Sequence, residues 1–161
     1  MIRSITAVLA CALAFPSLAG DIIAGDLRIE RPVVFKSFAK ARAAGGYMRV
    51  TNTGETDDLL IGVTVDGPMA MLHESREEDG VMRMIHLDAI EIPAGETVSF
   101  QPGGLHVMIM GLQPDDLPVG EALDATLIFD RTGEVEVIFN VEELPADGKM
   151  MDHGGHSHDN S

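Results

Sequence analysis

Hydrophobic and polar residues alternate along most of the chain between Leu27 and Val141, in short runs that turn residues separate. Alternation with a period of two is typical of β-strands that bury one face. Turn signals such as Asp79-Gly80 and Thr132-Gly133 recur about every ten residues. The pattern therefore predicts an all-β domain, an antiparallel β-sandwich or barrel. The predicted strands are Leu27 to Glu30, Gly46 to Asn52, Leu59 to Val65, Ala70 to Glu74, Val81 to Ile85, Glu96 to Phe100, His106 to Met110, Ala122 to Phe129 and Val135 to Val141.

Two stretches depart from the strand pattern. Ser37 to Ala44 has the composition of a helical turn, which Gly45-Gly46 would end. Beyond the last strand the alternation stops at Pro145, and the polar, glycine-containing remainder is predicted to be disordered. The sequence thus predicts one domain over residues 20–144 and a flexible tail over residues 145–161.

Residues 1–19 have the plan of a secretory signal peptide. Arg3 supplies a positive start, Ser4 to Phe15 is an apolar stretch, and Ser17-Leu18-Ala19 places small residues where a signal peptidase reads them. The uncharged run includes Pro16 and is shorter than the ~20 apolar residues of a membrane-spanning helix. We therefore predict export to the periplasm with cleavage at this site.

The chain's single cysteine, Cys11, lies within that segment. Val8-Leu9-Ala10-Cys11 faintly resembles a lipoprotein cleavage box, but it would leave an apolar region of only about seven residues, so signal-peptide cleavage is preferred. Cleavage after Ala19 removes the cysteine and leaves no disulfide, thiolate nucleophile or thiolate metal ligand. A blue-copper electron carrier, a thiol redox enzyme, a zinc ribbon and an iron–sulfur protein are therefore excluded.

The composition is strongly acidic. Asp and Glu number 26 against 11 Lys and Arg, and loss of Arg3 with the signal peptide changes the formal charge from −15 to −16. A nucleic-acid or anionic-membrane partner is disfavoured, because such binding neutralises phosphates with basic residues. We expect a monomer with no membrane-inserted segment. Glu77-Glu78 and Asp115-Asp116 are interpreted as solvated surface, and without an arranged nucleophile or base we expect that the protein is not an enzyme.

Methionine and histidine gather in three short segments of the predicted domain. On a β-strand, residues two apart point to the same face, so each segment presents its three groups together. Thioethers combined with imidazoles suit Cu(I), and thioethers select few other biological metals. The segments are Met69-x-Met71-x-His73, Met82-x-Met84-x-His86 and His106-x-Met108-x-Met110.

These nine groups are more than one ion can bind, so some of the methionines must be packing residues. His106 and Met108, two apart on one strand, form a firm local pair, and the hairpin from His73 to Met84 offers further ligands. Met69 or Met71 is also placed to shield a metal from water. We expect core or rim packing for Met48, Met69, Met71, Met82 and Met110.

The spacing from His73 through Met84 and His106 to Met108 resembles the motif of the PCuAC family of periplasmic copper chaperones. His86 departs from the pattern, since it stands where a non-ligand is expected and is a candidate second-sphere or alternative ligand. The resemblance spans about residues 25 to 142. The matching segments are Gly80-Val81-Met82-Arg83-Met84, Ile92-Pro93-Ala94-Gly95, Pro102-Gly103-Gly104-Leu105-His106-Val107-Met108-Ile109-Met110-Gly111-Leu112 and Thr126-Leu127-Ile128-Phe129 followed by Gly133.

This resemblance implies a cupredoxin-like β-sandwich that holds one Cu(I) near its surface through two histidines and two methionines. It also implies delivery of copper for assembly of the CuA centre of cytochrome c oxidase, with the CuA-bearing subunit and a Sco-type protein as partners. The implied ligands are His73, Met84, His106 and Met108.

The C-terminal tail carries a second group of donors. Imidazoles with carboxylates suit Cu(II), so the tail is a candidate Cu(II) site; the alternative is a solvated segment that binds zinc or nickel incidentally. The tail donors are Met150, Met151, His153, His156 and His158.

The sequence is also compatible with two other functions. The same copper site would also serve buffering or resistance, in which copper is sequestered and not delivered. From a different class, the domain would be a β-sandwich interaction module whose methionines are core residues.

Overall fold

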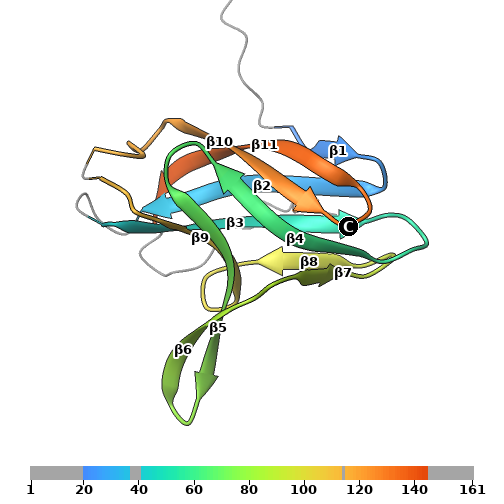
Figure 1. Ribbon diagram of the computed structural model, residues 1–161, viewed down its shortest axis with the longest axis horizontal. Helices are drawn as coiled ribbons and strands as arrows, with labels where there is room; N and C mark the ends of the chain where they lie inside the picture. The colour runs from blue at the N-terminus through green and yellow to red at the C-terminus, as the bar shows by residue number, and fades with distance from the viewer. Residues whose placement is uncertain (1–19, 37–40, 114, 145–161) are drawn as a thin grey trace, which may run out of the picture.

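The computed structural model describes residues 20–36, 41–113 and 115–144. Over these ranges the chain forms eleven β-strands and no helix, joined in one sheet that curls on itself (Figure 1). The all-β prediction is confirmed. The strands are β1 (Ile22–Ala24), β2 (Leu27–Lys36), β3 (Ala43–Asn52), β4 (Asp58–Val65), β5 (Met69–Glu78), β6 (Val81–His86), β7 (Ile90–Ile92), β8 (Thr97–Phe100), β9 (Leu105–Met110), β10 (Ala122–Phe129) and β11 (Gly133–Glu143).

The strands follow the order β6-β5-β9-β8-β3-β2-β11-β10-β4-β7 across the sheet, with β1 paired to β2 and β9 also paired to β3. The pairs β2–β11 and β8–β9 are parallel, and the other described pairs are antiparallel. Strands β4 and β5 lie far apart in this order, yet the curl of the sheet brings them together. The enclosed space is filled by fully buried side chains, among them Met48, Leu60, Phe100, Ile109, Leu127 and Phe139.

Strand β2 is longer than the sequence pattern predicts. It continues past Glu30 to Lys36, and its register with β3 shifts between Glu30 and Val33, where Arg31 has a φ of 48°. This β-bulge accommodates Pro32, because proline cannot donate a ladder hydrogen bond. Strand β2 therefore continues past Pro32, a residue type that normally ends a strand.

The helical turn predicted for Ser37 to Ala44 is wrong for its described part, because Ala43 and Ala44 belong to β3. The pattern also misses β1 and β7, which are too short to show a clear alternation. Residues 37–40, the predicted signal peptide and the predicted tail lie outside the described residues. Among the residues that are described, no helix has the length and hydrophobicity of a membrane span.

Asp58 ties the start of β4 to the turn between β10 and β11. Its buried carboxylate accepts hydrogen bonds from the backbone N–H groups of Leu59, Arg131 and Thr132 and from the Thr132 hydroxyl, at 2.7 to 3.1 Å. Burial alone would raise the pKa of Asp58, but these hydrogen bonds outweigh it and hold the pKa below its ordinary value. The ionised carboxylate therefore stabilises the fold.

We predict that Asp58→Asn lowers the free energy of unfolding at pH 7 by about 2 kcal/mol, because an amide cannot accept all four bonds. A lowered folded-state pKa gives stability that is present above the unfolded pKa of about 3.9 and is lost as pH falls through the folded pKa. The gap between variant and parent should therefore close below about pH 4 in urea unfolding. The exposed Asp130→Asn is the control; an equal gap at pH 7 and pH 3 would contradict the charge-based account.

Candidate metal site

The three Met/His segments form adjacent strands, β6, β5 and β9, at one end of the sheet. The β5–β6 hairpin projects from the body of the molecule in Figure 1. Leu72, Val107 and Ile109 point into the core and are almost fully buried, so the residues between them share the opposite face. We call that face the donor face. Its residues are Met69, Met71 and His73 of β5, Met82, Met84 and His86 of β6, and His106, Met108 and Met110 of β9.

The register between β5 and β9 brings like donors together in rows. His73 lies opposite His106, and Met71 lies opposite Met108. The two imidazole rings stack with centroids 5.9 Å apart and an interplanar angle of 24°. Successive rows on one face of a strand are about 7 Å apart. Two imidazoles and two thioethers are thus grouped on neighbouring strands.

His106 is held in one orientation by a backbone carbonyl. The residue is buried, and its Nδ1 lies 3.0 Å from the carbonyl of Gly104, which also accepts the Ser75 N–H at 2.9 Å. Because a carbonyl only accepts hydrogen bonds, Nδ1 carries a proton, so in the neutral ring the metal-binding lone pair is on Nε2. A hydrogen bond of this kind on the distal nitrogen is how metal-binding histidines are commonly oriented.

His73 is neutral and incompletely hydrogen-bonded. Burial lowers the pKa of His73, and the adjacent His106 and His86 lower it further; the Met71 carbonyl, near the ring but outside hydrogen-bond geometry, partly offsets this. Within the part of the chain that the structure describes, the buried Nδ1 has no hydrogen-bond partner. Such a group costs about 1–3 kcal/mol, a cost that a bound metal ion would remove. The residues present therefore fit a metal.

Met84 lies at the exposed rim of the donor face. It is 56% exposed and is paired with Ser75, two residues along β5 from His73. Diagonal neighbours across a ladder are about 7–8 Å apart, within reach of a long side chain. The structure thus groups His73, His106 and Met108 and leaves Met84 beside them. The predicted tail ligands Met150, Met151, His153, His156 and His158 lie outside the described residues.

The packing predictions for the other methionines have mixed outcomes. Met48 is fully buried, as predicted. Met69 and Met82 are each 57% exposed, so of the predicted core or rim positions they occupy the rim: Met82 lies on edge strand β6, and Met69 is the first residue of β5, opposite Met110 of β9. Met71 and Met110 are partly buried. Met71, expected as packing or shielding, stands directly opposite Met108 and is a further candidate ligand.

Tyr47 borders the site and was not anticipated from the sequence pattern. Its ring centroid lies 6.3 Å from that of His106 and 5.4 Å from that of Phe35. The phenol lies over Gly45, where a Cβ would come within 2.4 Å of the Tyr47 hydroxyl, and Gly45 is paired with Met108. Burial raises the pKa of Tyr47, so the ring is a neutral cover beside the donors.

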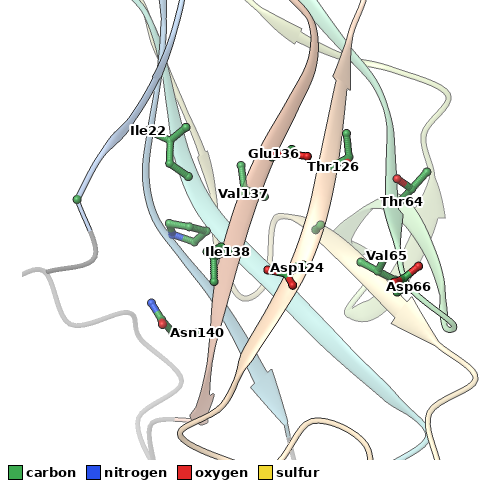
Figure 2. Close-up of a pocket in the computed structure, with 13 residues that line it drawn as sticks. Ile22, Thr64, Val65, Asp66, Asp124, Thr126, Glu136, Val137, Ile138 and Asn140 are labelled. Atoms are coloured by element: carbon green, nitrogen blue, oxygen red, sulfur yellow. The ribbon is translucent and has the colours of Figure 1, made fainter. Parts of the chain in front are cut away.

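A cavity of about 850 Å³ lies elsewhere, on β4, β10 and β11. Figure 2 shows Asp66, Asp124, Glu136, Thr64 and Thr126 around it. None of the predicted metal ligands that lie within the described residues lines this cavity, so it is a separate feature. Across residues 20–36, 41–113 and 115–144, no three His, Cys, Asp or Glu side chains are already grouped to hold a metal ion. The donor face differs from such a group because its imidazoles are combined with thioethers.

Comparison with known proteins gives both a family and solved relatives of the fold. The copper-bound PCuAC domain from PmoF2 matches with a TM-score of 0.65 and 30% identity, over 77% of this chain and 98% of that one. The Cu(I) form of DR1885 from Deinococcus radiodurans matches with a TM-score of 0.52 and 27% identity, over 78% of this chain and 82% of that one. The cupredoxin-like fold implied by the sequence resemblance is therefore confirmed.

A protein of Leifsonia xyli subsp. xyli, named "Putative lipoprotein Lxx21020", is 34% identical over 101 residues, which make up 60% of each chain. The present chain thus spans about 60% of the length of that relative. The family model described as "Putative lipoprotein LpqE-like" matches residues 26–141, most of the chain. This chain belongs to the LpqE-like family.

Proposed function

We propose that this protein is an exported copper chaperone that carries Cu(I) on its donor face through His73, Met84, His106 and Met108. The observation that carries the proposal is the in-register pair of His73 and His106 beside the pair of Met71 and Met108. Cu(I) is a soft ion, so two thioethers and two imidazoles suit it. The names of the PmoF2 and DR1885 structures, which record bound copper, support the same choice of metal.

The placement of the site favours exchange of the metal over permanent storage. Met84 is exposed on edge strand β6, so one ligand is accessible to a partner. Thioethers bind less tightly than thiolates, and the donor face contains no cysteine. In the tail we propose a second, Cu(II)-binding site at the donors named above.

We predict that Met84→Leu and Met108→Leu each weaken Cu(I) binding at least about tenfold while costing less than ~1.5 kcal/mol in stability, because leucine replaces the volume but not the sulfur. The measurement is an anaerobic Cu(I) titration against a chromophoric chelator. It uses a tail-silent chain, in which Met150, Met151, His153, His156 and His158 are alanine. Fluorescence of Tyr47, the chain's single tyrosine, gives a second readout.

Two matched variants make this test specific. Met82→Leu lies on the same strand and face as Met84 and is equally exposed, so its Cu(I) affinity should equal that of the parent. Met71→Leu decides whether Met71 replaces Met84 as the fourth ligand. If all four variants bind Cu(I) like the parent, the donor-face assignment is wrong.

We further propose that the recipient is the CuA-bearing subunit of cytochrome c oxidase, with a Sco-type thiol protein assisting. The Cu(I)-loaded chain, mixed with the reduced apo form of a soluble CuA domain, should lose its copper to that domain. Absorbance of the CuA centre after reoxidation measures the transfer. Retention of copper by the chaperone under these conditions, with or without the Sco-type protein, would instead favour buffering or resistance.

Export is proposed to proceed by cleavage after Ala19. The family's name brings the second possibility, lipid attachment at Cys11, back into consideration. Mass spectrometry of the protein isolated from a periplasmic fraction should give a chain that begins at Gly20 and carries no lipid. A chain that begins at a diacylated Cys11, and that moves out of the membrane fraction on Cys11→Ser, would show that the lipoprotein alternative is correct.

A further inference from the structure

A third histidine lies in the same row as the two proposed ligands. His86 of β6 is opposite His73 of β5, and His73 is opposite His106 of β9. The ring centroids are 5.4 Å apart for His86 and His73, in an edge-on arrangement of 62°, and 5.9 Å apart for His73 and His106. Three imidazoles thus cross three adjacent strands on the donor face.

Hydrogen bonds hold the backbone beside this row of histidines, whereas the imidazole ring of His86 is exposed. The Leu87 N–H donates to the Leu72 carbonyl at 2.9 Å, which holds the end of β6 against β5. Because β6 is the edge strand, His86 has a neighbouring strand on one side only, and its side chain is 53% exposed. The fully exposed Asp88 carboxylate lies 3.7 Å from His86 Nε2. An exposed ring of this kind changes rotamer on the picosecond to nanosecond scale.

We propose that His86 completes a second donor set, His73–His86–His106, which binds Cu(II) where the methionines and the same two histidines bind Cu(I). Cu(II) prefers nitrogen and oxygen ligands, whereas thioethers favour Cu(I). The inner pair is common to both sets. The oxidation state of the bound ion then decides whether thioethers or the third imidazole complete the coordination. This inference rests on the proposed function, because it assumes that His73 and His106 hold copper.

The set is assembled by movement of its exposed member. Among the described residues no three such groups already converge at a metal-binding geometry, so the His86 ring must turn toward the inner pair. His106 is fixed by the Gly104 carbonyl, and the partly buried His73 lies between His86 and His106, which leaves His86 as the adaptable ligand. Asp88 offers an oxygen donor next to it. The structural alternative is that His86 only packs its ring against His73.

The test uses the tail-silent chain from Gly20 onward, so that neither Cys11 nor the tail histidines can bind the probe. Cu(II) chloride is titrated against a competing chelator, and Cu(I) is titrated anaerobically in parallel. For His86→Ala we expect at least a tenfold loss of Cu(II) affinity, one fewer nitrogen in the electron paramagnetic resonance spectrum, and an unchanged Cu(I) affinity. A tenfold loss of Cu(II) affinity with unchanged Cu(I) affinity raises the reduction potential of the bound copper by about 59 mV.

Two further variants control for effects other than the loss of the His86 imidazole. His86→Gln keeps a polar side chain of similar length at the edge and should lose Cu(II) as His86→Ala does. Met82→Leu, on the same strand and face, should leave both affinities unchanged. Circular dichroism checks that each variant is folded.

The outcomes separate the two proposals. If the parent binds Cu(I) but His86→Ala keeps the parent's Cu(II) affinity and spectrum, the His86 inference is wrong and the proposed function stands. A parent that binds Cu(I) but no Cu(II) also overturns the inference alone. If both affinities fall together in His86→Ala, the residue belongs to the Cu(I) site and a separate Cu(II) set is contradicted. If the parent binds no Cu(I), the proposed function itself fails.

Discussion

The ladder between β5 and β9 is the constraint on which the donor face depends. One register places His73 opposite His106 and Met71 opposite Met108, while Leu72, Val107 and Ile109 enter the core. A slip of one residue would turn those three apolar side chains toward solvent, each worth ~1.5–3 kcal/mol of burial, and would turn the donors inward. The hydrophobic core therefore fixes the arrangement of the metal ligands.

Much of the fold is readable from the sequence because its signals are local. The alternation and the turn residues between the strands report the conformation of a few neighbouring residues. They locate nine of the eleven strands found in the described part of the chain. The features of the fold that these signals miss also have local causes. Strands β1 and β7 are too short to show a period, and the bulge at Arg31 carries β2 past Pro32. Strand order depends on long-range pairing, which no local pattern reports.

The candidate site also has features that follow from the local sequence and features that depend on strand order. The types of its donors and their shared face follow from sequence spacing. That Met71 meets Met108, that His86 meets His73, and that Tyr47 covers the neighbourhood of His106 depend on which strands are adjacent. The choice between core and rim for Met69 and Met82 depends on strand order as well. A methionine on a strand is usually buried, but Met82 lies on the edge strand β6 and Met69 is the first residue of β5, and both are exposed.

An exposed edge strand is normally a liability, because its unpaired backbone groups invite pairing with another chain. Strand β6 is short and carries Arg83, whose guanidinium lies 3.1 Å from the Glu78 carboxylate. These features limit edge-to-edge pairing. The edge therefore remains accessible to a metal or a partner without inviting aggregation. On one face of the β5–β9 ladder the side chains pack in the core, and on the other face they are exchangeable metal ligands. The stability of the fold and the lability of the site are therefore set by different side chains of the same strands.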